Sequence, residues 1–170
     1  MRDIYGFVGY ALFLAQVLEG ALEQAIQIFV LFPEKKDEIS EISKRQSLEE
    51  WNSFIEENDL SQKEKMLGRL LSKIRSSNTL SNDVLSSIEE ARKCRNYVAH
   101  QYFKDKIASL YNEPGQDAAI RSLGEICMKI KTAIDLLIPI VQKEMDRYGY
   151  DEEYTVEFAK KEISRASSAL

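Results

Sequence analysis

The sequence predicts an all-α fold, an antiparallel bundle of four to five helices in a single domain. The chain has 170 residues, long enough for one domain with its own core and short for two. Only 7 Gly and 3 Pro interrupt it, which favours long helices over many short strands and turns. No segment alternates apolar and polar residues with the period of two that a strand requires. We therefore expect one helical domain over residues 1–170.

Apolar periodicity and capping patterns place the individual elements. Ser47 and Glu50 have the spacing of a capping box, as do Ser61 and Glu64, so each pair is expected to open a helix. Pro33 is expected to stop the first helix, which is apolar on more than one face. Helices are expected over residues 3–32, 47–57, 61–75, 81–103, 117–148 and 153–165.

The remaining segments are expected to connect or end these helices. Residues 33–46 form a charged connector, and residues 112–115 (Asn-Glu-Pro-Gly) form a turn. Pro139 is expected to kink the long helix that Gly149 caps. A frayed tail is expected at residues 166–170.

Charge and cysteine content restrict the cellular compartments and the binding partners to be expected. The formal net charge of −5 offers no broad cationic surface for duplex phosphates, so DNA binding is not predicted, although a local basic site remains open. Cys94 and Cys127 lie among core-like neighbours and indicate reduced thiols without a disulfide framework. Polar residues from Gln16 onward interrupt the apolar N-terminal run before about 20 residues, the length of a membrane span. We expect a cytoplasmic protein with a buried first helix, no signal peptide and no membrane segment.

The helix expected over residues 81–103 carries an unusual residue. Its apolar seam consists of positions 84, 88, 91, 95, 98 and 102, which share one helical face, and position 95 of this seam is an arginine. A guanidinium stays charged, so Arg95 requires an anionic partner, a wet cleft or a ligand. Asn96 and His100 are one turn apart on a neighbouring polar stripe, close enough for the amide to orient the imidazole. Arg95 and His100, in contrast, differ by about 140° around an ideal helix.

Each of these residues also has a structural interpretation. His100 is the only histidine of the chain, and a lone histidine near an apolar face is more often structural than catalytic. Arg95 could form an ion pair with a carboxylate of a neighbouring helix, and Tyr102 could be a core tyrosine. Taken one by one, these interpretations are favoured.

Taken together, Arg95, Asn96, His100 and Tyr102 resemble the R-x4-H-x-Y signature of HEPN-domain proteins, which include toxins paired with minimal nucleotidyltransferase antitoxins. The resemblance is sharp over eight residues and only architectural elsewhere. It implies a metal-independent endoribonuclease that needs no cofactor and is a homodimer. It also implies Tyr102 as an adenylylation target for an antitoxin, which requires a hydroxyl that reaches solvent.

The chemistry of such a site is coherent with these residue types. Attack by the 2′-hydroxyl of RNA on the neighbouring phosphate needs a base, an acid for the leaving 5′-oxygen and a cation for the developing charge. His100 could act as base or acid, Arg95 could clamp the phosphate, Asn96 could orient the histidine or bind the phosphate, and Tyr102 could position the substrate. One histidine cannot be base and acid at once, and a symmetric dimer would supply two.

Two alternatives remain open. One is a non-catalytic HEPN-like module that binds RNA, a nucleotide or a protein partner, which the acidic net charge favours slightly. The other is a helical scaffold in which Arg95 pairs with a carboxylate and His100 bonds a buried carbonyl.

Overall fold

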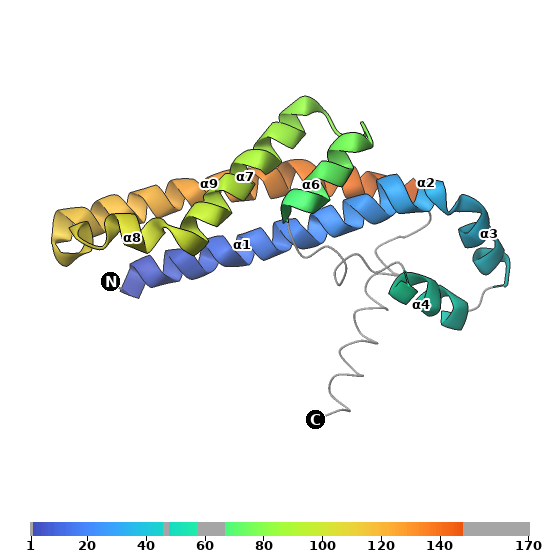
Figure 1. The fold of residues 1–170 in the computed structure, drawn as a ribbon, viewed down its shortest axis with the longest axis horizontal. Coiled ribbons are helices and arrows are strands. Elements are labelled where there is room, and N and C mark those ends of the chain that lie inside the picture. Colours follow the sequence, from blue (N-terminus) through green and yellow to red (C-terminus); the bar gives the residue numbers. More distant parts are fainter. Residues whose placement is uncertain (1, 46–47, 58–66, 148–170) are drawn as a thin grey trace, which may run out of the picture.

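The computed structural model describes residues 2–45, 48–57 and 67–147, and every regular element in these ranges is helical (Figure 1). The all-α prediction is therefore confirmed for the described part of the chain. The elements are α1 (Arg2–Ile26), the π-helical turn η1 (Gln27–Leu31), α2 (Phe32–Glu34), α3 (Lys36–Arg45), α4 (Leu48–Glu57), α6 (Leu67–Ser76), α7 (Asn82–His100), α8 (Tyr102–Lys106), the 3-10 turn η2 (Ser109–Tyr111) and α9 (Glu113–Arg147). The capping positions expected at residues 47, 61, 64 and 149, the helix over residues 153–165 and the tail at 166–170 lie outside the described residues.

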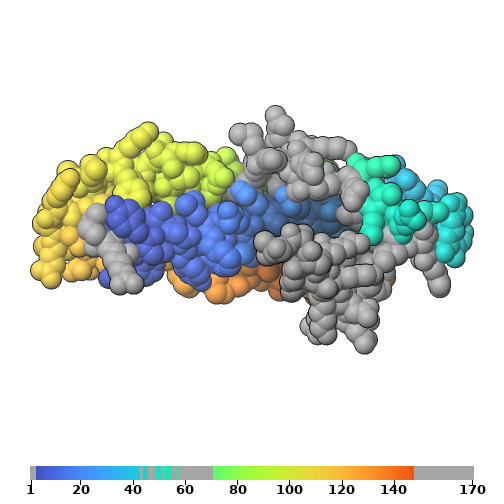
Figure 2. Space-filling model, turned by 90° about the horizontal axis from the view of Figure 1, so that it is seen from below, coloured from blue at the N-terminus to red at the C-terminus, as the bar shows by residue number. Residues whose placement is uncertain are grey.

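The two longest helices, α1 and α9, lie side by side and run in the same direction (Figures 1 and 2). The chain returns between them along α7, which packs on both and runs the opposite way, while α6 packs against α1 and α7. The expected antiparallel arrangement therefore describes α7 against its two neighbours, but it is wrong for the α1–α9 pair. Because α7 runs opposite to both long helices, α1 and α9 are parallel to each other.

The core lies where the inward stripes of α1, α7 and α9 meet. Leu18 and Leu22 of α1 and Leu123 and Leu137 of α9 have no exposed surface. These positions recur at helical spacing, and each fully buried leucine contributes about 1.5–3 kcal/mol through removal of apolar surface from water. The stripes of α1 and α9 therefore fix the frame on which α7 is held.

Pro33 does not stop the first helix, contrary to the sequence prediction. The chain stays helical through η1 into α2, and Pro33 lies in the first turn of α2. A proline ring clashes with the carbonyl four residues before it, and a π-helical turn widens the backbone at that place. The amide of Phe32 accordingly donates to the carbonyl of Gln27, five residues earlier.

The expected connector over residues 33–46 is also helical in its described part, since α3 spans most of it. Lys35 pairs with Glu38 at 2.9 Å and Lys44 with Glu41 at 2.8 Å, both at the i,i+3 spacing of a helix surface. Acidic residues in its first turn and basic residues in its last also oppose the helix dipole. The charges that suggested a connector are therefore those of a solvated helix.

The start of α9 replaces the turn expected at residues 112–115. The side-chain oxygen of Asn112 accepts a hydrogen bond of 2.8 Å from the amide of Gly115, as an N-cap does, and Pro114 occupies the first turn. Gly115 lies against the backbone of Ser109, where a Cβ atom would collide with the Ser109 carbonyl. α9 then continues through Pro139 to Arg147.

The N-terminal helical region also meets the length and composition of a membrane span. Within the described residues, one region, Asp3–Glu34, is long and apolar enough for that, and 33% of its most apolar window is buried inside the protein. A core helix of a globular domain satisfies the same criteria. The contacts of α1 with α9, α7 and α6 account for its buried side.

Candidate functional site

The segment from Arg95 to Tyr102 spans the end of α7 and the start of α8. The hydroxyl of Ser81 caps the beginning of α7 by accepting from the amide of Val84 at 3.4 Å, and the helix starts close to the residue expected from the sequence. The helix ends at His100, because Gln101 leaves helical geometry with φ −125° and ψ −29°. α8 begins directly afterwards, so the segment bends between His100 and Tyr102.

Arg95 lies at the edge of the apolar seam, not inside it. Its guanidinium faces Glu19 of α1, with 3.7 Å between Nη2 and Oε1, and its side chain is 34% exposed. Nη1 also donates to the Asn96 side-chain oxygen at 3.2 Å. An ion pair this long and this exposed contributes less than about 1 kcal/mol, so an incoming phosphate could displace it.

Asn96 and His100 are not joined as the i,i+4 spacing suggested. The Asn96 side-chain oxygen accepts from Arg95, and within the described residues no hydrogen bond or ion pair engages the imidazole of His100. His100 is exposed at the last position of α7. The structure thus groups Arg95 with Asn96 and leaves His100 free toward solvent one turn further along.

Tyr102 is a core residue. It has no exposed surface, and its hydroxyl donates to the main-chain oxygen of Ala119 in α9 at 3.1 Å. Burial raises the pKa of Tyr102, and the neighbouring Tyr97 adds to this. Direct contact of Tyr102 with a substrate therefore disagrees with its position. A hydroxyl that reaches solvent, the condition for adenylylation, is not present in this conformation.

Tyr97 is a second aromatic residue of the segment that the sequence did not single out. Its ring packs edge-on against Tyr102 with 5.8 Å between centroids. Burial raises the pKa of Tyr97 first, and the carboxylate of Asp105 in α8 raises it further. Tyr97 thus links the end of α7 to α8 and fixes the bend that follows His100.

Glu19 was likewise missed as a site residue. It is the first charged residue after Asp3, and fifteen uncharged residues separate the two. An isolated charge in a helix that is otherwise apolar signals a partner across a helix interface, as an arginine in an apolar seam does. The two signals belong to one contact, but only the packing of α7 on α1 joins them.

A stronger ion pair lies on the same helix, two turns before His100. Arg92 donates to both carboxylate oxygens of Glu89, at 2.6 and 3.1 Å. This hydrogen bonding lowers the pKa of Glu89 and raises that of Arg92. Arg92 is therefore already paired, whereas Arg95 is the guanidinium that a ligand could take.

Other candidate sites in the described residues suit an RNA substrate less well. The described residues contain no group of three His, Cys, Asp or Glu side chains placed to hold a metal ion. A groove of about 610 Å³ lies between α3 and α4, and its charged lining is one arginine, Arg45, against five glutamates: Glu38, Glu41, Glu49, Glu50 and Glu57. Such a lining repels phosphates.

The fold and the segment define a helical protein with an arginine–asparagine–histidine surface at the end of α7. Comparisons with family models, with curated proteins and with solved structures gave no significant match for this chain. The resemblance to HEPN proteins therefore rests on the residues from Arg95 to Tyr102 and on the all-helical architecture.

Proposed function

We propose that the protein is a metal-independent endoribonuclease of the HEPN type, acting on RNA through the surface formed by Arg95, Asn96 and His100. The observation that carries the proposal is the state of His100. It is the only imidazole of the chain, it is exposed at a helix end, and no described side chain occupies it. A structural histidine would instead have a buried carbonyl or carboxylate as partner.

In this proposal the residues divide the chemistry of 2′-hydroxyl attack. His100 removes the proton of the 2′-hydroxyl or protonates the leaving 5′-oxygen. Arg95, released from its long contact with Glu19, binds the phosphate and stabilises the developing charge, and Asn96 holds the guanidinium in place. The second proton-transfer group is His100 of a second copy, because each chain supplies one imidazole.

The experiment compares RNA cleavage by the wild type, His100→Ala and Arg95→Ala, with Arg121→Ala as the matched control. Arg121 is an exposed arginine of α9, so its loss removes the same charge away from the site. We expect His100→Ala to lower the cleavage rate by about 10²–10⁴-fold and Arg95→Ala by about 10²–10³-fold. Circular dichroism checks that each variant is folded. Equal activity in all four folded proteins would refute the proposal.

The long Arg95–Glu19 contact favours a second candidate, a non-catalytic HEPN-like module that binds RNA, a nucleotide or a protein partner. A carboxylate facing the candidate phosphate-binding arginine competes with substrate, and the net charge of −5 adds to this repulsion. The variant Glu19→Gln separates the two candidates. If Arg95 binds a scissile phosphate, Glu19→Gln increases RNA cleavage. If the site only binds, this change tightens ligand binding and no cleavage occurs.

The cellular role that follows is that of a cytoplasmic toxin or phage-defence effector. Growth arrest on expression, abolished by both His100→Ala and Arg95→Ala, is the expected phenotype. A nucleotidyltransferase antitoxin encoded next to this chain would support the paired-toxin form. Adenylylation of Tyr102 would further require α8 to open, since its hydroxyl is bonded to Ala119.

A further inference from the structure

One side of α1 faces away from the core and differs from every other long helical surface of the described chain. We call it the α1 outer face and define it by Gly6, Gly9, Tyr10, Phe13, Gln16 and Gly20. Tyr10 is 47% exposed and Phe13 57% exposed, and their rings stack on each other with 6.4 Å between centroids. Figure 2 shows the first half of α1 open along the face in view. Large exposed aromatic side chains in a row indicate a surface that is covered in the working assembly.

This face carries no charge. Between Asp3 and Glu19 the sequence has no Asp, Glu, Lys or Arg, although 30% of the whole chain is charged. The exposed side of α9 also holds large apolar residues, Met128, Leu136 and Ile138, but charged residues of both signs are interspersed with them: Arg121, Glu125, Lys129, Lys131 and Asp135. The outer side of α9 therefore has the mixed, charged composition of a surface that faces water, whereas that of α1 has no charged residue between Asp3 and Glu19.

We propose that the α1 outer face binds the α1 outer face of a second copy in an antiparallel pair, which brings two His100 side chains to one side of the dimer. The surface is self-complementary. A Cβ atom built at Gly6, Gly9 or Gly20 meets no side chain within 4 Å, so these glycines leave open space along the face that carries the rings of Tyr10 and Phe13. Across a two-fold axis, the rings of one copy can pack over the glycines of the other.

Electrostatics favours a second copy over a lipid surface as the occupant. Each copy has a net charge of −5, and an uncharged face is where two such copies can approach. Helices that lie on membranes carry Lys and Arg beside the apolar face, to meet anionic headgroups. Here the charged residues of α1 that follow the uncharged segment are acidic, Glu19 and Glu23.

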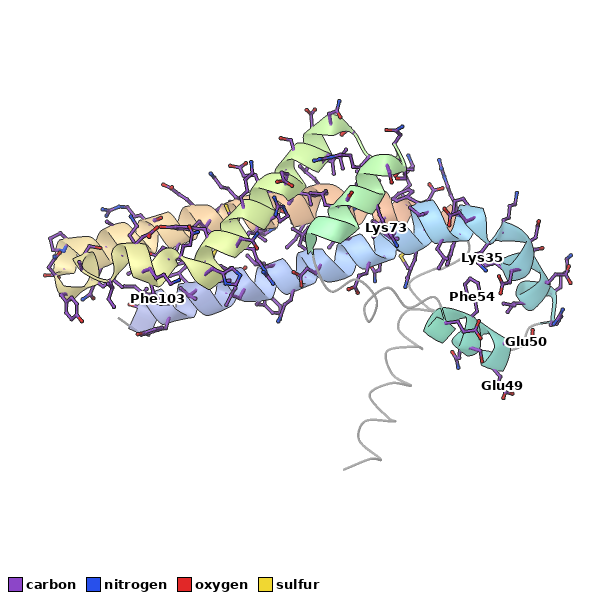
Figure 3. All side chains as sticks on the ribbon, in the orientation of Figure 1. Lys35, Glu49, Glu50, Phe54, Lys73 and Phe103 are labelled. Carbon is purple, nitrogen blue, oxygen red and sulfur yellow. The ribbon has the colours of Figure 1, made fainter. Side chains whose placement is uncertain are left out.

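The position of His100 gives the pair its orientation, and this step rests on the proposed function. Phe103 lies beside the first turns of α1, with 5.5 Å between its ring centroid and that of Tyr5 (Figure 3), and Arg95 reaches Glu19. His100 lies between these two contacts along the chain and is therefore at the level of the middle of α1 along the helix axis. In an antiparallel pair both copies of α7 lie on the same side of the paired helices, whereas a parallel pair separates them.

Assembly is measured first, on the full chain without RNA. Light scattering coupled to size exclusion is expected to give twice the mass of one chain for the wild type and for Met128→Asp, the matched control on α9. Phe13→Asp places a charge at the centre of the face and is expected to give the mass of one chain, with an unchanged circular dichroism spectrum. A wild type with the mass of one chain, or a Phe13→Asp variant that remains a dimer, would overturn the inference. Binding of the monomeric wild type to anionic lipid vesicles would overturn it as well.

Cross-linking tests the orientation. His100→Cys is expected to be joined to its copy by a short bismaleimide in the wild-type background and not in the Phe13→Asp background. Lys131→Cys, exposed on α9, serves as the control that stays unlinked in both. A dimer in which His100→Cys does not cross-link would refute the antiparallel arrangement. A wild-type chain, with His100 intact, that is a dimer and leaves RNA intact would uphold this interface and refute the ribonuclease proposal, so the two failures are distinguishable.

Discussion

α1 and α9 begin at the same end of the molecule, run side by side and bury a similar stripe, yet their outer faces have opposite characters (Figure 1). Both contribute fully buried leucines and isoleucines to one core. Outside the core, α9 alternates charges that pair with one another, such as Lys131 with Asp135 at 2.6 Å. α1 instead presents rings and glycines without a charge.

The difference shows that the buried stripe and the exposed face of a helix have separate roles. The inward stripe defines how the domain folds, and both helices agree on it. The exposed face determines what the helix contacts outside the domain. For α9 this is water, and for α1 it is a second copy in our proposal. An apolar first helix is therefore explained only in part by its own core.

The largest expected effects concern the stripe that both helices share. Leu18→Ala in α1 and Leu123→Ala in α9 each remove a side chain with no exposed surface. We expect each change to lower the free energy of unfolding by about 2–5 kcal/mol, because it loses burial and leaves a cavity. Urea denaturation measures this. A cost under about 1 kcal/mol for one leucine alone would show that its helix does not share the core equally.

Replacement of one glycine in each helix is expected to change stability in opposite directions. Gly115→Ala at the start of α9 is expected to cost about 1–3 kcal/mol, since the new methyl group meets the Ser109 carbonyl and the backbone must shift. Gly9→Ala in α1 has open space around it and should raise the stability of the monomer by about 0.5–1 kcal/mol through helix propensity.

Both glycine changes are compared by urea denaturation in the Phe13→Asp background, where the proposed dimer is absent. A loss of stability on Gly9→Ala in this monomer would mean that the α1 outer face contacts something within the same chain. The proposed difference between the outer faces of α1 and α9 would then be wrong.

The elements with local signals were predictable from the sequence, and those that depend on packing were not. The start of α7 near residue 81 and the long helix α9 follow from residues close in sequence. Pro33 and the charged residues after it were interpreted as the end of the first helix and a connector, because nothing in the sequence marks the π-helical turn that accommodates the proline. The antiparallel prediction was wrong for α1 and α9. The relative direction of two helices depends on the path of the chain between them, which the sequence does not show.

At the candidate site, the sequence located the segment but not its contacts. The seam indicated that Arg95 needs an anionic partner, a wet cleft or a ligand. The partner is Glu19, which is 76 positions away, and only tertiary packing brings the two residues together. The same seam contains Tyr102, so its burial was implied, whereas the family signature implied a hydroxyl in solvent. The structure agrees with the seam. The catalytic roles of Arg95, Asn96 and His100 stay predictions.

The Tyr102 hydroxyl joins α7–α8 to α9, and its removal is expected to have a moderate effect. Tyr102→Phe keeps the buried ring and loses the hydrogen bond to Ala119, which lowers the free energy of unfolding by about 1 kcal/mol. RNA cleavage should be unchanged at temperatures where the variant is folded. Thermal denaturation and a cleavage assay on the same samples measure both. A large loss of cleavage with unaltered stability would instead give Tyr102 a direct role at the site.

The smallest expected effect concerns α7, the helix that packs on both α1 and α9. Hydrogen bonding to Arg92 lowers the pKa of Glu89 from its ordinary value of 4.5, so the folded state favours the carboxylate. A lowered pKa stabilises the fold above the unfolded value, and this contribution, under about 1 kcal/mol for a pair near the surface, is lost as pH falls through the folded value. The stability difference between the wild type and Glu89→Gln, measured in urea, should therefore be present at pH 7 and shrink below about pH 4. Glu125→Gln on the outer side of α9 is the matched control. A Glu89→Gln difference that stays constant with pH would mean that the amide loses packing and not an ion pair, and α7 would then be held by its apolar contacts with the two long helices alone.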